Sequence, residues 1–229
     1  MRSVASLEVA TGLPGRRGPD GDVRYVARPR GIDRSRGPKR FTLSDSDLRR
    51  FFQVTQDCGN VEHEIMLKFL FYTSIRVSEL VHIKISDVDL NNHKVFIDQG
   101  KGSKDRYILF PASFRLILSS HLQSHPKNRY LFESSRFGPY TTRRIQQIVA
   151  EYRTLAGIEQ RIFPHLFRHM MLTWLTKQGL SDAQIQLISG HGSKKSLEVY
   201  QHLGLESVEA SYQAAASLAE ATLNGSQCG

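Results

Sequence analysis

The stretch from Phe163 to Tyr200 constrains the fold more than any other part of this chain. His165 and Arg168 are three residues apart in it, so an α-helix would place both side chains on one face. Apolar residues recur beside them at helical spacing and predict a buried stripe, formed by Phe167, Met170, Met171, Trp174 and Leu175. We therefore expect a cationic pair on a helix that packs against the core.

Two shorter helices are predicted next, each bounded by its own signals. Gly179 is suited to end the first helix of the stretch, and Ser181 with Gln184 forms a capping box that opens the second. Gly190 ends that helix, so His191 is expected at a turn. The second helix turns Ile185, Leu187 and Ile188 inward, and a last helix, capped by Ser193, carries Leu197, Val199 and Tyr200.

Composition narrows the class of partner. The chain has 229 residues, of which 40% are hydrophobic, enough for a real core, and its formal charge of +9 points to an anionic partner. Nucleic acid is the first candidate and a membrane surface the competing one. No apolar run approaches the roughly 20 residues needed to span a bilayer, and no signal peptide is recognisable, so a cytoplasmic protein is expected. The cysteines, Cys58 and Cys228, lack ligand-like spacing, so neither a disulfide framework nor a metal site is expected.

Residues 1–40 differ in composition from the rest. They contain ten Lys and Arg residues, four acidic residues and few large apolar side chains, which predicts a flexible basic arm. The arm is expected either to contact phosphates or to be a solvated tail, and it can also be a stretch foreign to the native protein.

Residues 41–204 predict a mainly α domain with a small antiparallel β-sheet. Thr42 or Ser44 can cap a first helix, and a denser apolar helix follows it. Two short runs, 94–98 and 105–110, are rich in β-branched and aromatic residues and predict a β-hairpin.

Further amphipathic helices are predicted after Pro111, after Thr141 or Thr142, and over residues 205–223. The last of these, in a C-terminal segment spanning 205–229, is expected to pack either on its own domain or on a neighbouring protomer. The expected inward residues of the domain's other helices are Leu48, Phe51, Phe52, Ile65, Leu67, Phe69, Leu70, Phe71, Phe114, Leu116, Ile117, Leu122, Ile145, Ile148, Val149, Tyr152 and Leu155; those of the last helix are Val208, Tyr212, Ala215, Leu218 and Ala219.

Two charged features are ambiguous when taken alone. Arg76 and Glu79 are three residues apart, which is also the spacing of an ordinary surface salt bridge of little energy. Lys101 and Lys104 lie in the turn of the hairpin, where lysines are often simply solvated.

Taken together, the charged residues indicate phosphodiester chemistry. Arginine binds non-bridging phosphate oxygens in a bidentate way and keeps its charge, so it suits a phosphorane-like transition state. A tyrosine hydroxyl needs nearby positive charge and a hydrogen-bonding histidine to become a nucleophile, and a lysine can protonate the departing alkoxide. The set therefore fits attack of a tyrosine on a phosphodiester.

At these residues the chain resembles the catalytic domain of the tyrosine recombinases, the family that includes phage-type integrases and chromosome-dimer resolving recombinases. The resemblance spans 41–203. It rests on Arg76 in Thr-Ser-Ile-Arg-Val-Ser-Glu-Leu, Lys101 in Gly-Lys-Gly-Ser-Lys, His165 and Arg168 in His-Leu-Phe-Arg-His, His191 in Leu-Ile-Ser-Gly-His, and Tyr200 nine residues later. Ser74 stands where the family commonly has glycine.

The resemblance implies a site-specific recombinase or integrase, typical of a mobile genetic element, that acts on double-stranded DNA through a 3′-phosphotyrosine intermediate. Tyr200 would be the nucleophile, and neither ATP, metal nor another cofactor would be needed. A homo-oligomer on DNA, dimeric or tetrameric, is also implied. We expect further DNA contacts from Lys104, Arg106, Arg143, Arg144 and His169.

Two other functions remain open at this point. Residues 1–40 are not expected to form the helical core-binding domain that the family carries before its catalytic domain. A chain with this organisation can instead be a non-catalytic DNA-binding protein that regulates a full-length recombinase. It can also relax DNA without strand exchange, as the related type IB topoisomerases do.

Overall fold

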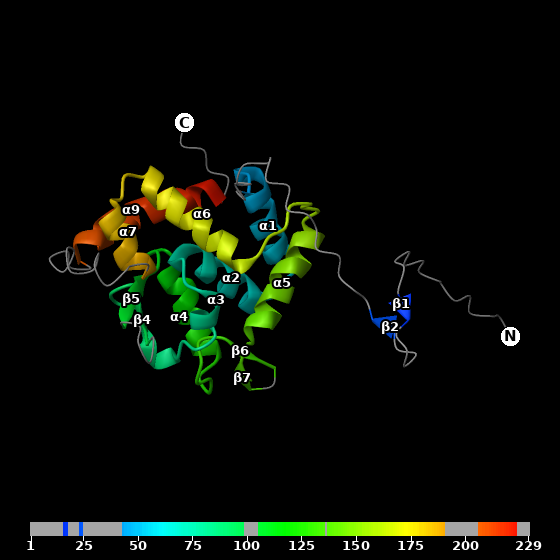
Figure 1. The fold of residues 1–229 in the computed structure, drawn as a ribbon. Helices are drawn as coiled ribbons and strands as arrows, with labels where there is room; N and C mark the ends of the chain where they lie inside the picture. The colour runs from blue at the N-terminus through cyan, green and yellow to red at the C-terminus, as the bar shows by residue number, and fades with distance from the viewer. Residues whose placement is uncertain are drawn as a thin grey trace. The chain divides into compact units, whose positions relative to one another are not determined.

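The computed structural model describes residues 16–17, 23–24, 43–98, 105–135, 137–190 and 206–223 (Figure 1). The chain divides into two compact units, residues 1–40 and 41–229. In the first unit, β1 (Arg16–Arg17) pairs antiparallel with β2 (Val23–Arg24). The rest of the predicted basic arm lies outside the described residues, so its flexibility stays a prediction.

The second unit is mainly helical, with small antiparallel sheets, as the sequence predicts. Strands β3 (Val88–Asp89), β4 (Lys94–Ile97) and β5 (Arg106–Leu109) form one sheet, and β6 (Glu133–Ser134) pairs with β7 (Gly138–Pro139). The helices are α1 (Asp45–Asp57), α2 (Val61–Thr73), α3 (Val77–Leu80), the 3₁₀ helix η1 (Ile85–Asp87), α4 (Phe114–Ser124), α5 (Thr142–Leu155), α6 (Pro164–Lys177), α7 (Asp182–Ser189) and α9 (Glu206–Leu223).

Local capping signals fix where several helices begin. Ser44 caps α1 by accepting a hydrogen bond from the backbone of Asp47, and Thr141 caps α5 in the same way. The predicted capping box of Ser181 and Gln184 opens α7. These signals act within one turn of chain, so the sequence alone is enough to locate them.

The core is built around α2, which is apolar on nearly all sides. Its residues from Ile65 to Thr73 are buried except for Lys68, and α1, α4 and α6 pack against it. A helix of this composition belongs at the centre of a domain. Aromatic rings join the layers: Phe51 and Phe52 of α1 lie 5.3 and 5.9 Å from Phe167 of α6, measured between ring centroids. Such tilted and edge-on contacts add stability beyond the burial of apolar area.

The register of the β-hairpin determines where its charged residue points. Val95 pairs with Ile108 and Ile97 pairs with Arg106, so these four side chains lie on one face. That face is buried at Val95, Ile97 and Ile108. The start of β5 also packs against α7. Arg106 therefore points into the domain.

Four apolar residues predicted to face inward are instead exposed. In α4, the buried positions are Phe114, Leu118 and His121, whereas Leu116 and Ile117 are 76% and 43% exposed. The run Phe-Arg-Leu-Ile-Leu offers more than one helical stripe, and packing against α2 selects the one through Leu118. Two further residues predicted to face inward are also exposed, Leu155 at the end of α5 and Leu218 in α9.

Helix α9 packs on its own domain, against α1 and α6. The hydroxyl of Tyr212 donates to the carbonyl of Tyr72 at 3.0 Å, and Trp174 Nε1 donates to the carbonyl of Ala215 at 3.0 Å. Tyr212 is fully buried. The sequence left two placements open for this helix, on its own domain or on a neighbouring protomer, and in the described residues it packs on its own domain.

Candidate active site

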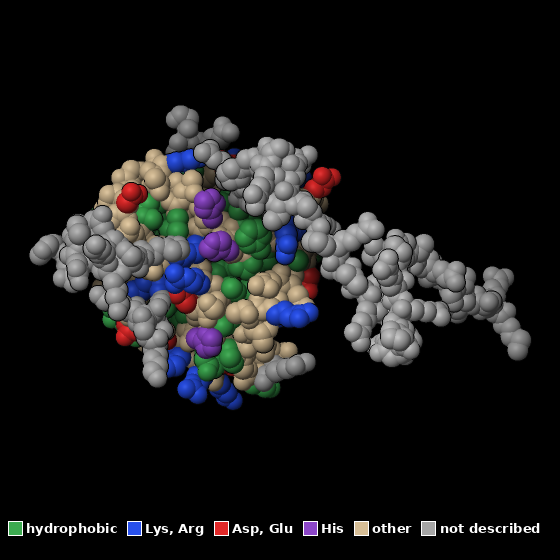
Figure 2. All heavy atoms as spheres, in the orientation of Figure 1, with side chains coloured by type: hydrophobic (Ala, Val, Ile, Leu, Met, Phe, Trp, Pro, Cys, Tyr) green, Lys and Arg blue, Asp and Glu red, His purple; other side chains and the backbone are tan. Residues whose placement is uncertain are grey.

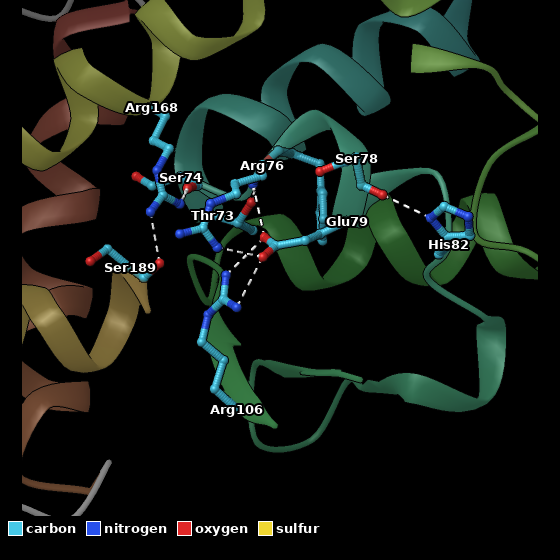
Figure 3. Close-up of polar contacts among 10 residues, drawn as sticks. Thr73, Ser74, Arg76, Ser78, Glu79, His82, Arg106, Arg168 and Ser189 are labelled. Carbon is cyan, nitrogen blue, oxygen red and sulfur yellow. Dashed lines mark hydrogen bonds and ion pairs between the residues drawn. The ribbon is translucent and has the colours of Figure 1, made fainter. Parts of the chain in front are cut away.

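The loop between α2 and α3 presents Arg76 beside a partly buried carboxylate, that of Glu79 (Figure 3). The Arg76 backbone donates to Glu79 Oε2 at 3.0 Å, and its Nη1 donates to Glu79 Oε1 at 2.7 Å. The side chain of Arg76 is 36% exposed and that of Glu79 only 12%. The spacing of three residues thus forms the expected ion pair, but the carboxylate is largely shielded from solvent. Glu79 orients a guanidinium group that remains accessible.

Ser74, whose backbone has the left-handed conformation, turns the chain from α2 toward Arg76. Ser74 has φ 52° and ψ 25° and closes the C-terminal end of α2. Its side chain is buried, and its Oγ has no hydrogen-bond partner within the described part of the chain. Its carbonyl accepts a hydrogen bond from Arg168 Nη1. Ser74 therefore directs the chain toward Arg76 and also accepts a hydrogen bond from Arg168.

Arg168 crosses the core from α6 and holds two helix ends together. Its Nη1 donates to the carbonyl of Ser74, and its Nη2 donates to the carbonyl of Ser189 at 2.7 Å. The residue is 1% exposed. Burial, followed by the nearby charge of Arg76, lowers the pKa of Arg168 to about 10, so it still carries its positive charge at neutral pH. Each carbonyl lies at the C-terminal end of a helix, where positive charge is favourable.

Arg106 approaches Glu79 from β5, opposite Arg76 (Figure 3). Its Nη1 and Nη2 donate to Oε1 and Oε2 of Glu79 at 3.1 and 2.8 Å. Burial by itself would raise the pKa of Glu79, but the charge of Arg106 and the hydrogen bonds of Arg76 and Arg106 hold this pKa below its ordinary value of 4.5. Two guanidinium groups bind this carboxylate, and the guanidinium of Arg168 lies close enough to feel its charge, so the cluster carries excess positive charge and suits an anion.

The histidines of α6 lie at the surface. His165 and His169 are exposed, in contrast to Arg168 between them. The two histidines are four residues apart and share the exposed face of the helix, whereas Leu166, Phe167 and Arg168 are buried. Histidine and basic side chains gather on the face of the domain shown in Figure 2.

Of the remaining predicted site residues, the structure describes Arg143 and Arg144. Arg143 is exposed in the first turn of α5, and Arg144 is half-buried, with its Nη1 2.7 Å from Glu151 Oε1. Four predicted residues lie outside the described part of the chain: Lys101, Lys104, His191 and Tyr200. The structure thus brings Arg76 and Arg168 together, and the positions of the lysines, His191 and Tyr200 stay predictions.

The partner of Arg106 was not predicted from the sequence. Arg106 and Glu79 are 27 residues apart, a spacing with no local meaning. A partial signal exists in the alternation of Arg106 with Ile108 and Phe110, which already places Arg106 on the inward face of its strand. An arginine on an inward face needs a charged partner, and Glu79 is that partner.

The described residues contain neither a candidate metal site nor a candidate membrane-spanning helix. Over those ranges, no group of three or more His, Cys, Asp and Glu side chains is arranged to hold a metal ion. Among the helices that the structure describes, none is both long and apolar enough to cross a membrane.

Comparison with known proteins identifies similar sequences over most of the second unit. Residues 42–206 match the phage integrase family. The tyrosine recombinase XerC of Bacillus pumilus strain SAFR-032 is 31% identical over 182 residues, which cover 74% of this chain and 59% of that protein. A tyrosine recombinase of Pseudothermotoga lettingae is 33% identical over 164 residues, covering 70% and 56%. The chain thus spans less than two thirds of these relatives.

Solved structures show the same fold. The XerA recombinase is 29% identical with a TM-score of 0.62, over 79% of this chain and 66% of that one. A lambda integrase dimer bound to a COC′ core site is 17% identical with a TM-score of 0.57, over 70% and 62%. The second comparison shows similarity of fold alone.

Proposed function

This chain belongs to the phage integrase family, and on that premise we propose that it is a tyrosine-type site-specific recombinase that cleaves and rejoins double-stranded DNA. The observation that carries the proposal is the convergence of Arg76 and Arg168 from segments far apart in the chain. Arg168 reaches a carbonyl 94 residues away, and Arg76 lies two residues beyond that carbonyl. A pair of fixed guanidinium groups is what the two non-bridging oxygens of a scissile phosphate require.

The proposed reaction begins when the Tyr200 hydroxyl attacks the scissile phosphorus. A new bond forms between the tyrosine oxygen and phosphorus while the bond to the 5′ oxygen breaks. His165 or His191 accepts the tyrosine proton, and Lys101 donates a proton to the departing 5′ oxygen. Arg76 and Arg168 stabilise the negative charge that develops on the phosphate.

The products are a 3′-phosphotyrosine and a free 5′-hydroxyl. Because the ester keeps the energy of the broken bond, a 5′-hydroxyl of a partner strand can reverse the step without ATP. The guanidinium groups supply the charge that a metal ion supplies in other phosphoryl transfers, so we propose a metal-independent reaction.

Double-stranded DNA is the proposed partner. The net charge of +9 supports binding to a polyanion, and Arg143 and His169, both exposed, are proposed to contact it with Arg144 and Lys104. A solved relative, XerH recombinase, was crystallised with its difH substrate. The lambda integrase comparison is a dimer on DNA, which supports a homo-oligomer on DNA here. We also propose a cytoplasmic protein and a role in DNA integration by a mobile element, since an integrase of the Tn1549 transposon has the same fold.

The test uses a nicked suicide duplex, from which the cleaved strand end diffuses away. The duplex carries a candidate recombination site and is incubated in EDTA with wild-type protein or Tyr200→Phe, then resolved on a denaturing gel. We expect a covalent adduct with wild-type protein and none with Tyr200→Phe, which lacks only the hydroxyl. DNA binding without any adduct, across several site sequences, would favour a non-catalytic DNA-binding protein. Relaxation of supercoiled plasmid without recombinant products would favour a topoisomerase-like activity.

A further inference from the structure

Arg106 contacts Glu79, which holds Arg76, and Gly190, which follows the residue that holds Arg168; both arginines are proposed to bind the scissile phosphate. On one side, its two Nη atoms hold the carboxylate of Glu79, which in turn holds Arg76. On the other side, its side chain lies against Gly190, the residue after Ser189. The carbonyl of Ser189 accepts a hydrogen bond from Arg168.

The contact with Gly190 is close enough to exclude a side chain. A Cβ atom built on Gly190 would lie 2.7 Å from Nε of Arg106 and 2.8 Å from its Cδ. Gly190 also has φ 65°, in the left-handed region. The C-terminal end of α7 therefore rests directly on the Arg106 side chain.

The contacts of Arg106 tie it to the residue that holds Arg76. Its side chain is 10% exposed, and both Nη atoms donate to the carboxylate of Glu79. Its Nε is buried without a hydrogen-bond partner in the described residues and faces Gly190. A planar guanidinium can span both carboxylate oxygens while its flat face and stem pack on a backbone, and a lysine cannot.

We propose that Arg106 is a positioning residue for the cleavage step, acting through Glu79 on Arg76 and through Gly190 on the helix end that binds Arg168. Arg106 thereby sets the distance between the two phosphate-binding guanidinium groups before DNA arrives. This assignment rests on the proposed function, and it replaces the DNA contact that the sequence suggested for Arg106. Small displacements of such groups lower rates strongly, because the reacting geometry is narrow.

The first test separates positioning from DNA contact by measuring the two properties independently. Arg106→Gln and Arg106→Lys are compared with wild-type protein in single-turnover cleavage of the nicked suicide duplex and in equilibrium DNA binding at several salt concentrations. We expect cleavage to slow by roughly tenfold to a hundredfold. We expect affinity within about twofold of wild type and an unchanged slope of log affinity against log salt, since no phosphate contact is lost.

A different pattern would overturn the proposal. If Arg106 binds a phosphate, Arg106→Gln loses affinity and its salt slope falls by about one, whereas Arg106→Lys retains much of the binding. The control is Arg50→Gln on α1, which removes a surface ion pair with Asp47. Melting temperature and circular dichroism of every variant show whether the fold is intact.

A double-mutant cycle tests whether Arg106 acts through Arg76. If it does, Arg106→Gln slows cleavage much less in the Arg76→Ala background than in the wild-type background, because the group to be positioned is already gone. Equal effects in the two backgrounds would contradict the proposal. A general loss of stability would slow both backgrounds alike.

Glycine variants test the second contact. Gly157 has φ 62°, close to that of Gly190, but has nothing within 4 Å of a Cβ atom. Gly157→Ala therefore introduces the strain of the left-handed backbone conformation without a steric clash. We expect Gly190→Ala to lower the cleavage rate more than Gly157→Ala does, and Arg106→Ala to remove most of that difference. A difference that persists without Arg106 would count against the contact.

One measurement is independent of cleavage, so that the two proposals can fail separately. The Nε–H signal of Arg76 is followed by NMR in the DNA-free protein and assigned by its loss in Arg76→Lys. We expect it to shift toward the signals of exposed arginines in Arg106→Gln and to stay unchanged in Arg50→Gln. An unchanged signal in Arg106→Gln would refute positioning. Absence of an adduct with wild-type protein would refute the proposed function and leave this measurement valid.

Discussion

Arg168 Nη2 lies 2.7 Å from the carbonyl oxygen of Ser189, so a buried guanidinium of α6 closes the C-terminal end of α7. The same side chain holds the carbonyl of Ser74 at the end of α2. The proposed phosphate-binding arginine is therefore also a structural element, and its substitution should affect stability as well as chemistry.

We predict that Arg168→Ala lowers both the cleavage rate and the free energy of unfolding. Loss of a preorganised donor should slow adduct formation by roughly 10²–10³-fold. Two buried carbonyls would lose a donor, which should cost roughly 2 kcal/mol or more in urea denaturation. Arg161→Ala on the exposed surface is the control, and a stability close to wild type in Arg168→Ala would contradict the buried contacts.

Ser74→Gly should stabilise the protein by about 1 kcal/mol. Glycine removes both the cost of the left-handed conformation at φ 52° and the burial of an unpartnered hydroxyl. Ser74→Ala removes the hydroxyl alone, so the difference between the two variants in urea denaturation isolates the backbone strain. A less stable Ser74→Gly variant would mean that the hydroxyl makes a favourable contact.

The ion pairs of Glu79 should make stability depend on acid pH. Its pKa in the folded protein is below the ordinary value of 4.5, so the folded state binds fewer protons at this group than the unfolded state does. The stabilisation is complete above pH 4.5 and is lost as the pH falls through the lower, folded-state pKa. Thermal unfolding between pH 3 and 6 should therefore show a smaller pH dependence for Glu79→Gln than for wild type. Parallel curves would argue against the pairing with Arg76 and Arg106.

Removing the hydroxyl of Tyr212 should weaken the attachment of α9. Tyr212→Phe leaves the carbonyl of Tyr72 without its donor in a buried site, at a cost of about 1–2 kcal/mol in urea denaturation. Tyr107→Phe, on the exposed side of the hairpin, provides the comparison and should be nearly neutral. If both substitutions are neutral, α9 does not depend on this bond.

Arg143 and Arg144 should differ in their contributions to DNA affinity. Arg143→Gln removes an exposed charge and should lower the slope of log affinity against log salt by about one. Arg144→Gln should lower it less, because Arg144 already pairs with Glu151. The assay is fluorescence anisotropy at several salt concentrations. The opposite order would indicate that DNA displaces Glu151 from Arg144.

The sequence was sufficient wherever the determining contacts lie within a few residues. The capping box of Ser181 and Gln184 and the pair of Arg76 and Glu79 each involve residues three apart, so their partners can be identified without knowing the fold. The periodicity of α5 likewise identified Ile145 and Ile148 as buried. For the catalytic set, the order and spacing of the motifs indicated the family.

Tertiary structure alone decided how these local pieces meet. Which apolar stripe of α4 faces inward depends on its packing against α2, and Leu116 is exposed for that reason. The sharing of Glu79 between Arg76 and Arg106 depends on the strand β5 lying beside α3, which no local spacing encodes. Arg168 can be buried because carbonyls at two helix ends, distant in the sequence, accept its hydrogen bonds. Hydrogen bonds within one turn are specified by the local chain, whereas contacts between distant segments exist only after the core has brought them together.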